Sequence, residues 1–284
     1  MKKLRDCASG SMNTGTSKCP IDFAKIIGAI IVSYGYKLPA DLTADQLEEL
    51  AHADGNDRIY GIVRFVEYAK NGGEAQTATN GYGPEEFNGF SARKDTYTLN
   101  RFSPELNSNL IRNAHLPKGV YFFDESNFLY GLDDGTDTLA PFPVSSIYSD
   151  VTPHPTSSAK SAMTVTFCFE DVKQAYVDFD YVKLDFNPAK LTLGLVDVVI
   201  AKVGDKGSEY KIYEKVGRFD VTGIYGPLLA TAGEKCFANN TTTAVTYNTE
   251  AKTLTIALAD GAEARLKSPA VLYKNGITGI EQVA

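Results

Sequence analysis

Short runs of alternating aromatic, branched and polar residues, separated by turn sequences, constrain this chain more than any other feature. The run AMTVTFCF at residues 162–169 places Met163, Val165 and Phe167 on one face of a strand, with polar or small residues on the other. The chain has 16 Tyr and 15 Phe but no Trp, and Tyr and Phe favour the pleated, half-buried surface of a sheet. The sequence therefore predicts a fold built mainly of antiparallel strands.

Pairs of such runs that flank turn residues predict three hairpins. GVYFFDESNFLYGLDDG, residues 119–135, turns at DESN, and LTLGLVDVVIAKVGDKGSEYKIYEKVG, residues 191–217, turns at GDKG. AVTYNTEAKTLTIALADG, residues 244–261, predicts the third. By contrast, NGYGPEEFNG at residues 80–89 lacks the glycine spacing of a phosphate-binding turn and predicts a loop.

Two segments predict short helices. In LTADQLEELAHAD, Thr43 and Gln46 have the spacing of a capping box, in which each side chain accepts a hydrogen bond from the other residue's backbone N–H. In SPELNSNLIRNAH, Ser103 is a suitable N-cap and Pro104 occupies the first helical position, where its missing N–H costs nothing. We expect no other helices.

These patterns divide the chain into three segments. Residues 1–38 contain a Ser-, Gly- and Lys-rich arm and then the run FAKIIGAIIV, which is too short to cross a bilayer and predicts a buried segment. We expect residues 39–225 to form the main β-sandwich with the two helices, and residues 226–284, with Pro227 at the boundary, a small C-terminal β unit. The predicted fold class is thus α+β, mainly β: an antiparallel β-sandwich with a smaller C-terminal β unit.

Five carboxylates lie between Ala162 and Phe186 and raise the question of a functional site. Apolar residues occupy odd positions from Val177 to Tyr181 and even positions from Val182 onward. A strand that buries both sets needs an extra residue or a bend, so we predict a β-bulge or sharp corner at Tyr181–Val182. On this interpretation the acids cover the solvent or interface face of a twisting sheet and do not form a metal cluster. The five are Glu170, Asp171, Asp178, Asp180 and Asp185.

The charge is acidic and unevenly distributed. The net charge of −7 argues against nonspecific nucleic-acid binding, which needs clustered Lys and Arg. Residues 119–159 contain no Lys or Arg, and wherever this segment reaches the surface we expect a negative potential. Its acids are Asp124, Glu125, Asp133, Asp134, Asp137 and Asp150.

Residue patterns that carry common chemistry are missing from the sequence. There is no phosphate-binding loop and no nucleophile elbow. DDGTD at residues 133–137 lacks the later acidic ligand of a calcium loop and predicts a hairpin turn. Cysteines and histidines occur at positions without ligand spacing: Cys7, Cys19, Cys168, Cys236, His52, His115 and His154.

We therefore predict no catalytic residue, no cofactor-binding residue and no metal ligand, and a protein that is not an enzyme. The run MKKLRDCASG lacks the apolar region of a signal peptide, so we expect no export and no membrane association. A hydrolase whose dispersed carboxylates, such as Asp178 and Asp180, meet in space is one alternative.

Two parts of the sequence resemble a known class of protein. The order DTYTL…LIRNAHLPKGVYFFDESNFLYGL…FPVSSIYSDVTPHPTSSAKSAMTVTFCFED, within residues 85–175, resembles virion structural proteins of tailed bacteriophages of gut anaerobes. ALADGAEARLKSPAVLYKNGITGIE, within residues 240–284, is similar to their C-terminal unit. The resemblance implies a noncatalytic, tail-tube-like β-sandwich that assembles into rings, although the chain is longer than simple tail-tube subunits.

The resemblance also implies partners and a location. The partners would be copies of the same chain and other virion proteins, with no specific nucleic-acid binding beyond passive DNA passage. The location would be the virion, after synthesis in the host cytoplasm. An acidic lumen or interface face would then come from Asp133, Asp134, Asp137, Asp178 and Asp180.

Two other positions or roles remain open from the sequence. One is a capsid-associated or head–tail structural protein, which would share the same fold and assembly chemistry. The other is a carbohydrate- or host-surface-binding β module, because exposed aromatic rings on a sheet suit sugar stacking, although such sites commonly use Trp.

Overall fold

The computed structural model describes most of the chain and divides it into two compact units. The described residues are 23–99, 101–152, 154–158, 160–204, 207–238, 244–258 and 263–283, so the expected N-terminal arm lies outside them. Within this part, the larger unit comprises residues 23–47 and 59–192, and the smaller unit residues 48–58 and 193–283. The boundary that we expected at residue 226 falls inside helix α5, and the C-terminal part of the smaller unit begins earlier, at Leu193.

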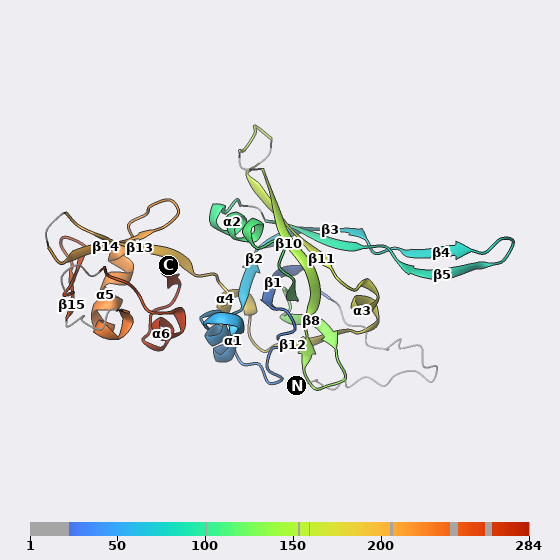
Figure 1. Ribbon diagram of the computed structural model, residues 1–284, viewed down its shortest axis with the longest axis horizontal. Coiled ribbons are helices and arrows are strands. Elements are labelled where there is room, and N and C mark those ends of the chain that lie inside the picture. Colours follow the sequence, from blue (N-terminus) through green and yellow to red (C-terminus); the bar gives the residue numbers. More distant parts are fainter. Residues whose placement is uncertain are drawn as a thin grey trace. The chain divides into compact units, whose positions relative to one another are not determined.

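The larger unit is built on one antiparallel sheet of ten strands (Figure 1). Its strands follow the path β12-β8-β7-β10-β11-β6-β3, while β1 pairs with β2 and β7, and β9 pairs with β8. The strands are β1 (Ile26–Ser33), β2 (Tyr60–Val63), β3 (Phe65–Gly72), β6 (Arg93–Leu99), β7 (Lys118–Asp124), β8 (Phe128–Asp133), β9 (Leu139–Ala140), β10 (Phe142–Thr152), β11 (Ala162–Phe169) and β12 (Phe179–Lys183). The expected mainly β, antiparallel fold class is thus confirmed.

Strand β7 is the centre of this sheet. One of its edges pairs with β1 from Lys118 to Asp124, and its other edge is shared between β10 at Val120 and β8 at Phe123. Residues 119–124 are all buried. Most of the apolar run at Phe23–Val32 lies in β1, where residues 28–32 are buried as expected, whereas Phe23 before the strand is half exposed. The run belongs to the main sheet and not to a separate segment.

The core of the larger unit is formed by the apolar residues that alternate along the strands of the sheet and pack against one another. Met163, Val165 and Phe167 of β11 are fully buried, which confirms the alternation expected for this strand. The ring centroid of Phe167 lies 5.2 Å from that of Phe122 on β7 and 6.0 Å from that of Tyr97 on β6. Edge-to-face aromatic pairs of this kind add to the stabilisation that burial gives.

Both expected helices are present with their expected caps. In α1 (Ala44–Ala51) the Thr43 backbone N–H donates to Gln46 Oε1 at 3.0 Å, and the Gln46 N–H donates to Thr43 Oγ1 at 3.2 Å. In α2 (Pro104–Arg112) Ser103 Oγ accepts from the Leu106 N–H at 3.4 Å. The capping box at Thr43 is therefore confirmed.

The described residues contain six α-helices, so two was too few. Helix α3 (Val172–Val177) begins after Asp171, whose side chain accepts from the Gln174 N–H at 2.9 Å. It removes Val177 from the strand that we predicted there. Strand β12 then pairs with β8 in continuous register from Phe179 to Lys183, so the bulge predicted at Tyr181–Val182 is wrong. The short helix α4 (Pro188–Leu191) follows.

A long hairpin leaves the larger sheet between β3 and β6. Strands β4 (Ala75–Thr79) and β5 (Glu85–Phe90) pair only with each other among the described residues. Figure 1 shows them extending beyond the strands that precede and follow them. The segment predicted as a loop at residues 80–89 therefore contains most of β5, and only its first residues turn.

The smaller unit has a five-stranded sheet in the order β15-β16-β14-β13-β17. Its core includes the fully buried Ile212, Leu229 and Leu254. The hairpins predicted at residues 191–217 and 244–261 are the pairs β13–β14 and β15–β16. Its elements are η1 (Gly55–Asp57), β13 (Val196–Lys202), β14 (Glu209–Glu214), α5 (Thr222–Ala232), η2 (Gly233–Cys236), β15 (Val245–Asn248), β16 (Thr253–Ile256), α6 (Pro269–Lys274) and β17 (Ile280–Glu281).

Candidate functional site

The acids expected to form one face come from two segments that the sheet brings together. Asp133 ends β8, and its backbone N–H donates to the Asp178 carbonyl oxygen at 2.7 Å. Asp180 lies on β12 opposite Gly131 of β8. Since Asp134 and Asp137 follow directly in the turn from β8 to β9, all five expected acids belong to one region at the β8–β12 edge of the sheet.

The DDGTD turn is held by its own carboxylates, as a hairpin turn requires. Asp133 Oδ1 accepts from the Gly135 N–H at 2.9 Å, and Asp134 Oδ1 accepts from the Thr136 N–H at 3.0 Å. Strands β8 and β9 pair across it, so the predicted hairpin turn is confirmed. Asp134 also forms an ion pair with Lys37. Hydrogen bonds from Lys37 and Thr136 hold the pKa of Asp134 well below its ordinary value.

Asp124, another acid of the basic-free segment, does not reach the surface. It is fully buried. One oxygen accepts from the backbone N–H groups of Ser126 and Phe128, at 2.9 and 2.8 Å. The other accepts from the Tyr130 hydroxyl at 2.6 Å and the Ala24 N–H at 3.0 Å. This carboxylate therefore ties the β7–β8 turn to the start of β1 and contributes nothing to a surface patch.

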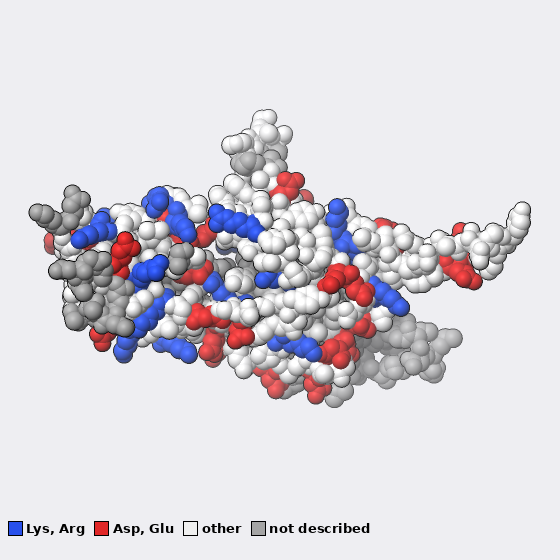
Figure 2. Space-filling model, viewed as in Figure 1, with Lys and Arg blue, Asp and Glu red and all other residues white. Residues whose placement is uncertain are grey.

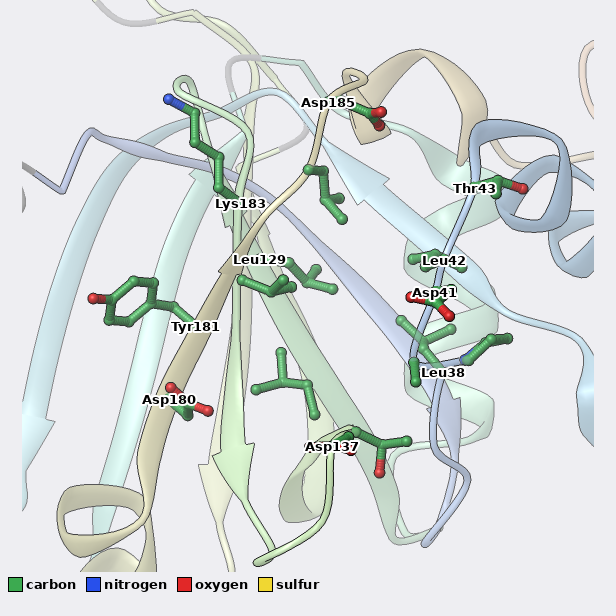
Figure 3. Close-up of a pocket in the computed structure, with 16 residues that line it drawn as sticks. Leu38, Asp41, Leu42, Thr43, Leu129, Asp137, Asp180, Tyr181, Lys183 and Asp185 are labelled. Atoms are coloured by element: carbon green, nitrogen blue, oxygen red, sulfur yellow. The ribbon is translucent and has the colours of Figure 1, made fainter. Parts of the chain in front are cut away.

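A cavity of about 240 Å³ lies beside β12 (Figure 3). Its walls come from the segment after β1, from β12 and from the β8–β9 turn, with Leu129 of β8 between them. Figure 3 shows Asp41, Asp137 and Asp185 at three positions around the leucines of this cavity. The lining residues are Leu38, Pro39, Ala40, Asp41, Leu42, Thr43, Leu129, Asp137, Thr138, Leu139 and residues 180–185.

An aromatic cluster covers the opposite side of β12. The ring of Phe23 meets those of Tyr130 and Tyr181 edge to face, each at 5.4 Å between centroids. Phe179 stacks on Tyr130 at 5.8 Å. Phe23 and Phe179 are about half exposed, at 51% and 44%. The exposed rings at this sheet edge were not predicted as a group, because Phe23 and β12 lie far apart in the sequence.

The second surface of interest is the β4–β5 hairpin. Tyr82 at its tip is fully exposed and Phe87 on β5 is 58% exposed. Residues 71–92 contain Glu74, Glu85 and Glu86 but no Lys or Arg, and Figure 2 shows acidic side chains on the outer part of the hairpin. Sequence reasoning missed this surface because no buried alternation marks the two strands.

The residue types that commonly hold metals or perform catalysis do not gather in the described residues. His52 is buried with its ring stacked on Tyr273 at 4.7 Å and its Nδ1 2.8 Å from the Glu48 carbonyl oxygen. Within the described ranges, no three His, Cys, Asp or Glu residues are placed to hold a metal ion. None of the described helices is long and apolar enough to span a membrane.

Comparison with known proteins gives little further guidance. No protein-family model and no curated protein matches the sequence. Among solved structures, a chain of the anti-feeding prophage baseplate, from a 6-fold symmetrised cryo-EM structure, aligns with 60% of this chain and 99% of its own length. The two chains share 8% sequence identity, with a TM-score of 0.28. A likeness of this size does not establish a common fold.

Proposed function

We propose that this chain is a noncatalytic structural subunit of a phage virion, of the tail-tube type, which assembles into rings with copies of itself. The observation that carries the proposal is the β4–β5 hairpin. An isolated two-stranded hairpin is at best marginally stable in water, and further strands or a packing surface are needed to stabilise it. Among the described residues no further strand pairs with this hairpin, and it packs on the core of its own chain at its base, through Phe90. A neighbouring subunit is therefore the natural support for its outer part.

The side chains on the hairpin suit such a contact. Tyr82 and Phe87 offer large apolar surfaces that become buried when a partner covers them, and aromatic residues are enriched at the centres of protein interfaces. The three glutamates of the hairpin would orient it against a positively charged neighbour. The sequence resemblance to tailed-phage virion proteins supports the same role.

The acidic region at the β8–β12 edge has a place in this proposal. In a ring, Asp133, Asp134 and Asp137 would line the lumen and keep passing DNA from binding, as the resemblance to tail-tube subunits implies. Asp178 and Asp180 would face the lumen or the neighbouring subunit. A reconstruction of the assembled protein that put these five residues on the outer surface would overturn the lumen assignment but leave assembly standing.

The experiment is assembly of the purified full chain, followed by negative-stain electron microscopy and sedimentation at increasing concentration. We expect rings or tubes from the unaltered protein. The variant Tyr82→Ser/Phe87→Ser should raise the concentration needed for assembly at least about tenfold, with an unchanged thermal midpoint. The matched control is Ile224→Ser, which alters a residue of similar exposure, 64%, on α5 of the smaller unit. Monomers of the unaltered protein under all conditions would rule out self-assembly.

A capsid-associated or head–tail position is the close variant of this proposal. It predicts assembly only when another virion protein is present, so co-expression with the neighbouring structural genes distinguishes it from a self-assembling tube.

A carbohydrate-binding module is the second candidate function, and the half-exposed rings of Phe23 and Phe179 favour it. Such rings stack on the apolar faces of sugars. Clear hits on a glycan array, lost in the variant Phe179→Ala, would support this role over assembly.

A further inference from the structure

We propose that the β4–β5 hairpin of one copy docks on residues 111–118 of the next copy, a segment at the end of α2 that we call the basic turn. The inference rests on the proposed function and names the surface that receives the hairpin. It follows from three observations: the composition of the basic turn, the complementary side chains of the hairpin, and the positions of both on the larger unit.

The basic turn exposes two large aliphatic side chains close together in the sequence. Ile111 is 54% exposed and Leu116 is 38% exposed. The Ala114 N–H donates to the Ile111 carbonyl oxygen at 3.4 Å, and the Leu116 N–H to that of Asn113 at 3.0 Å. These two overlapping hydrogen-bonded turns keep the segment compact. Exposed aliphatic groups gathered in this way suit contact with a partner.

The same turn carries cations that no carboxylate neutralises within the chain's described part. Arg112 is exposed and Lys118 is partly exposed. Residues 106–118 contain no Asp or Glu, and neither cation belongs to an ion pair among the described residues. The basic turn therefore offers positive charge beside apolar surface. By contrast, Lys37, Lys211 and Lys215 are each paired with an aspartate.

The hairpin has the complementary side chains. Glu85 and Phe87 are two residues apart on β5, so they lie on the same face of the strand, and both are exposed. Glu86 adds a second exposed carboxylate, and residues 71–92 contain no Lys or Arg. Docking would bury the Phe87 ring against the aliphatic groups of the basic turn while the glutamates meet its cations.

The hairpin and the basic turn lie on different sides of the larger unit. Figure 1 shows the hairpin pointing away from α2, and Figure 2 shows basic side chains where Figure 1 draws α2. At about 3.3 Å per residue, the strand from Gly73 to Gly81 carries the tip roughly 25 Å from its base. A copy's hairpin therefore reaches a neighbour and not its own basic turn. Contacts between two different surfaces, repeated from copy to copy, build a ring or a filament.

Another exposed apolar surface of the larger unit fits the hairpin less well. Val177 is 70% exposed and Phe179 is 44% exposed. Asp178 and Asp180 alternate with them in the sequence. Like charges brought together across an interface are unfavourable, so these acids would repel the glutamates of the hairpin.

Charge reversal on both surfaces tests the pairing. Arg112→Glu/Lys118→Glu and Glu85→Lys/Glu86→Lys should each raise the concentration at which the full chain assembles at least about tenfold, measured by sedimentation. All four substitutions in one chain should restore assembly, because the two reversed surfaces again carry opposite charges. An unchanged assembly concentration in Arg112→Glu/Lys118→Glu would overturn the inference, and so would a failure of the fourfold variant to recover.

The matched control changes the net charge by the same amount at two other exposed lysines. Lys25→Glu/Lys190→Glu alters residues outside the basic turn and the hairpin, so it should assemble as the unaltered protein does. The thermal midpoint of each variant shows whether it folds. If Arg112→Glu/Lys118→Glu fails to fold, the hairpin variant and the cross-linking below decide the question.

Site-specific cross-linking identifies the receiving surface directly. A photoreactive benzoylphenylalanine in place of Phe87 should cross-link to peptides that contain residues 111–118. In an equal mixture of ¹⁴N- and ¹⁵N-labelled protein, we expect cross-linked pairs of mixed isotope, as contact between copies requires. Rings whose cross-links lead to other surfaces would overturn this inference and leave the proposed assembly standing. Unaltered protein that stays monomeric and gives no cross-link between copies would overturn both.

Discussion

The hairpins β7–β8 and β4–β5 belong to the same unit but are stabilised in opposite ways. In β7–β8, residues 119–124 are buried and Asp124 closes the turn with hydrogen bonds from both its own loop and the start of β1. In β4–β5, all of β4 and most of β5 are exposed. Both hairpins have the backbone pairing of a two-stranded ribbon, but β7 of the first is buried from residue 119 to residue 124, whereas the second contacts the core through Phe90 at its base.

The comparison separates what the chain needs to fold from what it offers to a partner. Burial of apolar area is the main favourable term in folding, and β7–β8 takes part in it fully. The β4–β5 hairpin contributes little burial of its own. Its exposed residues therefore matter more for contacts with a partner than for folding of the unit. Breaking the first hairpin should therefore unfold the protein, whereas altering the second should leave the isolated fold intact.

The largest effect is expected from Asp124→Ala. The substitution leaves four donors without their acceptor, among them the buried Tyr130 hydroxyl and the Ala24 N–H, and unsatisfied buried polar groups are costly. We expect a loss of about 3–4 kcal/mol in the free energy of unfolding, measured by urea denaturation. Glu125→Gln, an exposed residue of the same turn, is the control. Equal stability of the two variants would contradict the role of Asp124.

A smaller effect is expected at the other end of β8, where Lys37 pairs with Asp134. Because the pair lowers the pKa of Asp134 in the folded state, it stabilises the fold above the ordinary carboxyl pKa, and this stabilisation is lost as the pH falls below about 4. Both side chains are partly solvated, so the contribution is under about 1 kcal/mol. Lys37→Met should lower the free energy of unfolding at pH 7, and this loss should become progressively smaller as the pH falls from 4 to 2. The same loss at pH 7 and pH 2 would exclude the ion pair as its cause.

The smallest effect on stability is expected from shortening the hairpin. Replacing residues 76–89 by a Gly-Gly turn, which joins the paired residues Ala75 and Phe90 and keeps Phe90 on the core, should change the free energy of unfolding of the isolated subunit by less than about 0.5 kcal/mol, because little apolar area is lost from the core. Hydrogen exchange sharpens the comparison: amides of β7 should be protected strongly and those of β4 weakly. In assembled protein the β4 amides should become protected. Strong protection in the monomer would show that the hairpin is stable without a partner.

Of the two capped helices α1 and α3, only α1 could be predicted from the sequence. Thr43 and Gln46 indicated α1 because apolar residues with helical spacing follow them. Asp171 and Gln174 have the same spacing, and Asp171 accepts from the Gln174 N–H as Thr43 accepts from the Gln46 N–H. The aromatic alternation from Val177 onward nevertheless favoured a strand over a helix of only six residues. Because Val177 was assigned to the strand, the change of the apolar residues from odd to even positions after Tyr181 predicted a bulge.

Long-range placement was harder to predict than local structure. The alternation in β11 and the turn after Asp133 could be read directly, because strand faces and turns depend on neighbouring residues. The cavity beside β12 is lined by the segment after β1 and by residues 137–139 and 180–185. No local sequence pattern predicts that these distant segments lie close together. Pro227 suggested a boundary, yet it lies within α5, where the packing of the smaller unit outweighs the intrinsic preference of proline.

The central position of β7 has a consequence for the order of events during synthesis. Its partner β1 is made about 90 residues earlier, and translation at roughly 5–20 residues per second leaves that apolar strand without its neighbour for several seconds. The run IIGAIIV is an aggregation hazard during that interval. We expect nascent chains that stop before β7 to bind a holding chaperone and longer ones to release it, which pull-down of stalled ribosome complexes would measure.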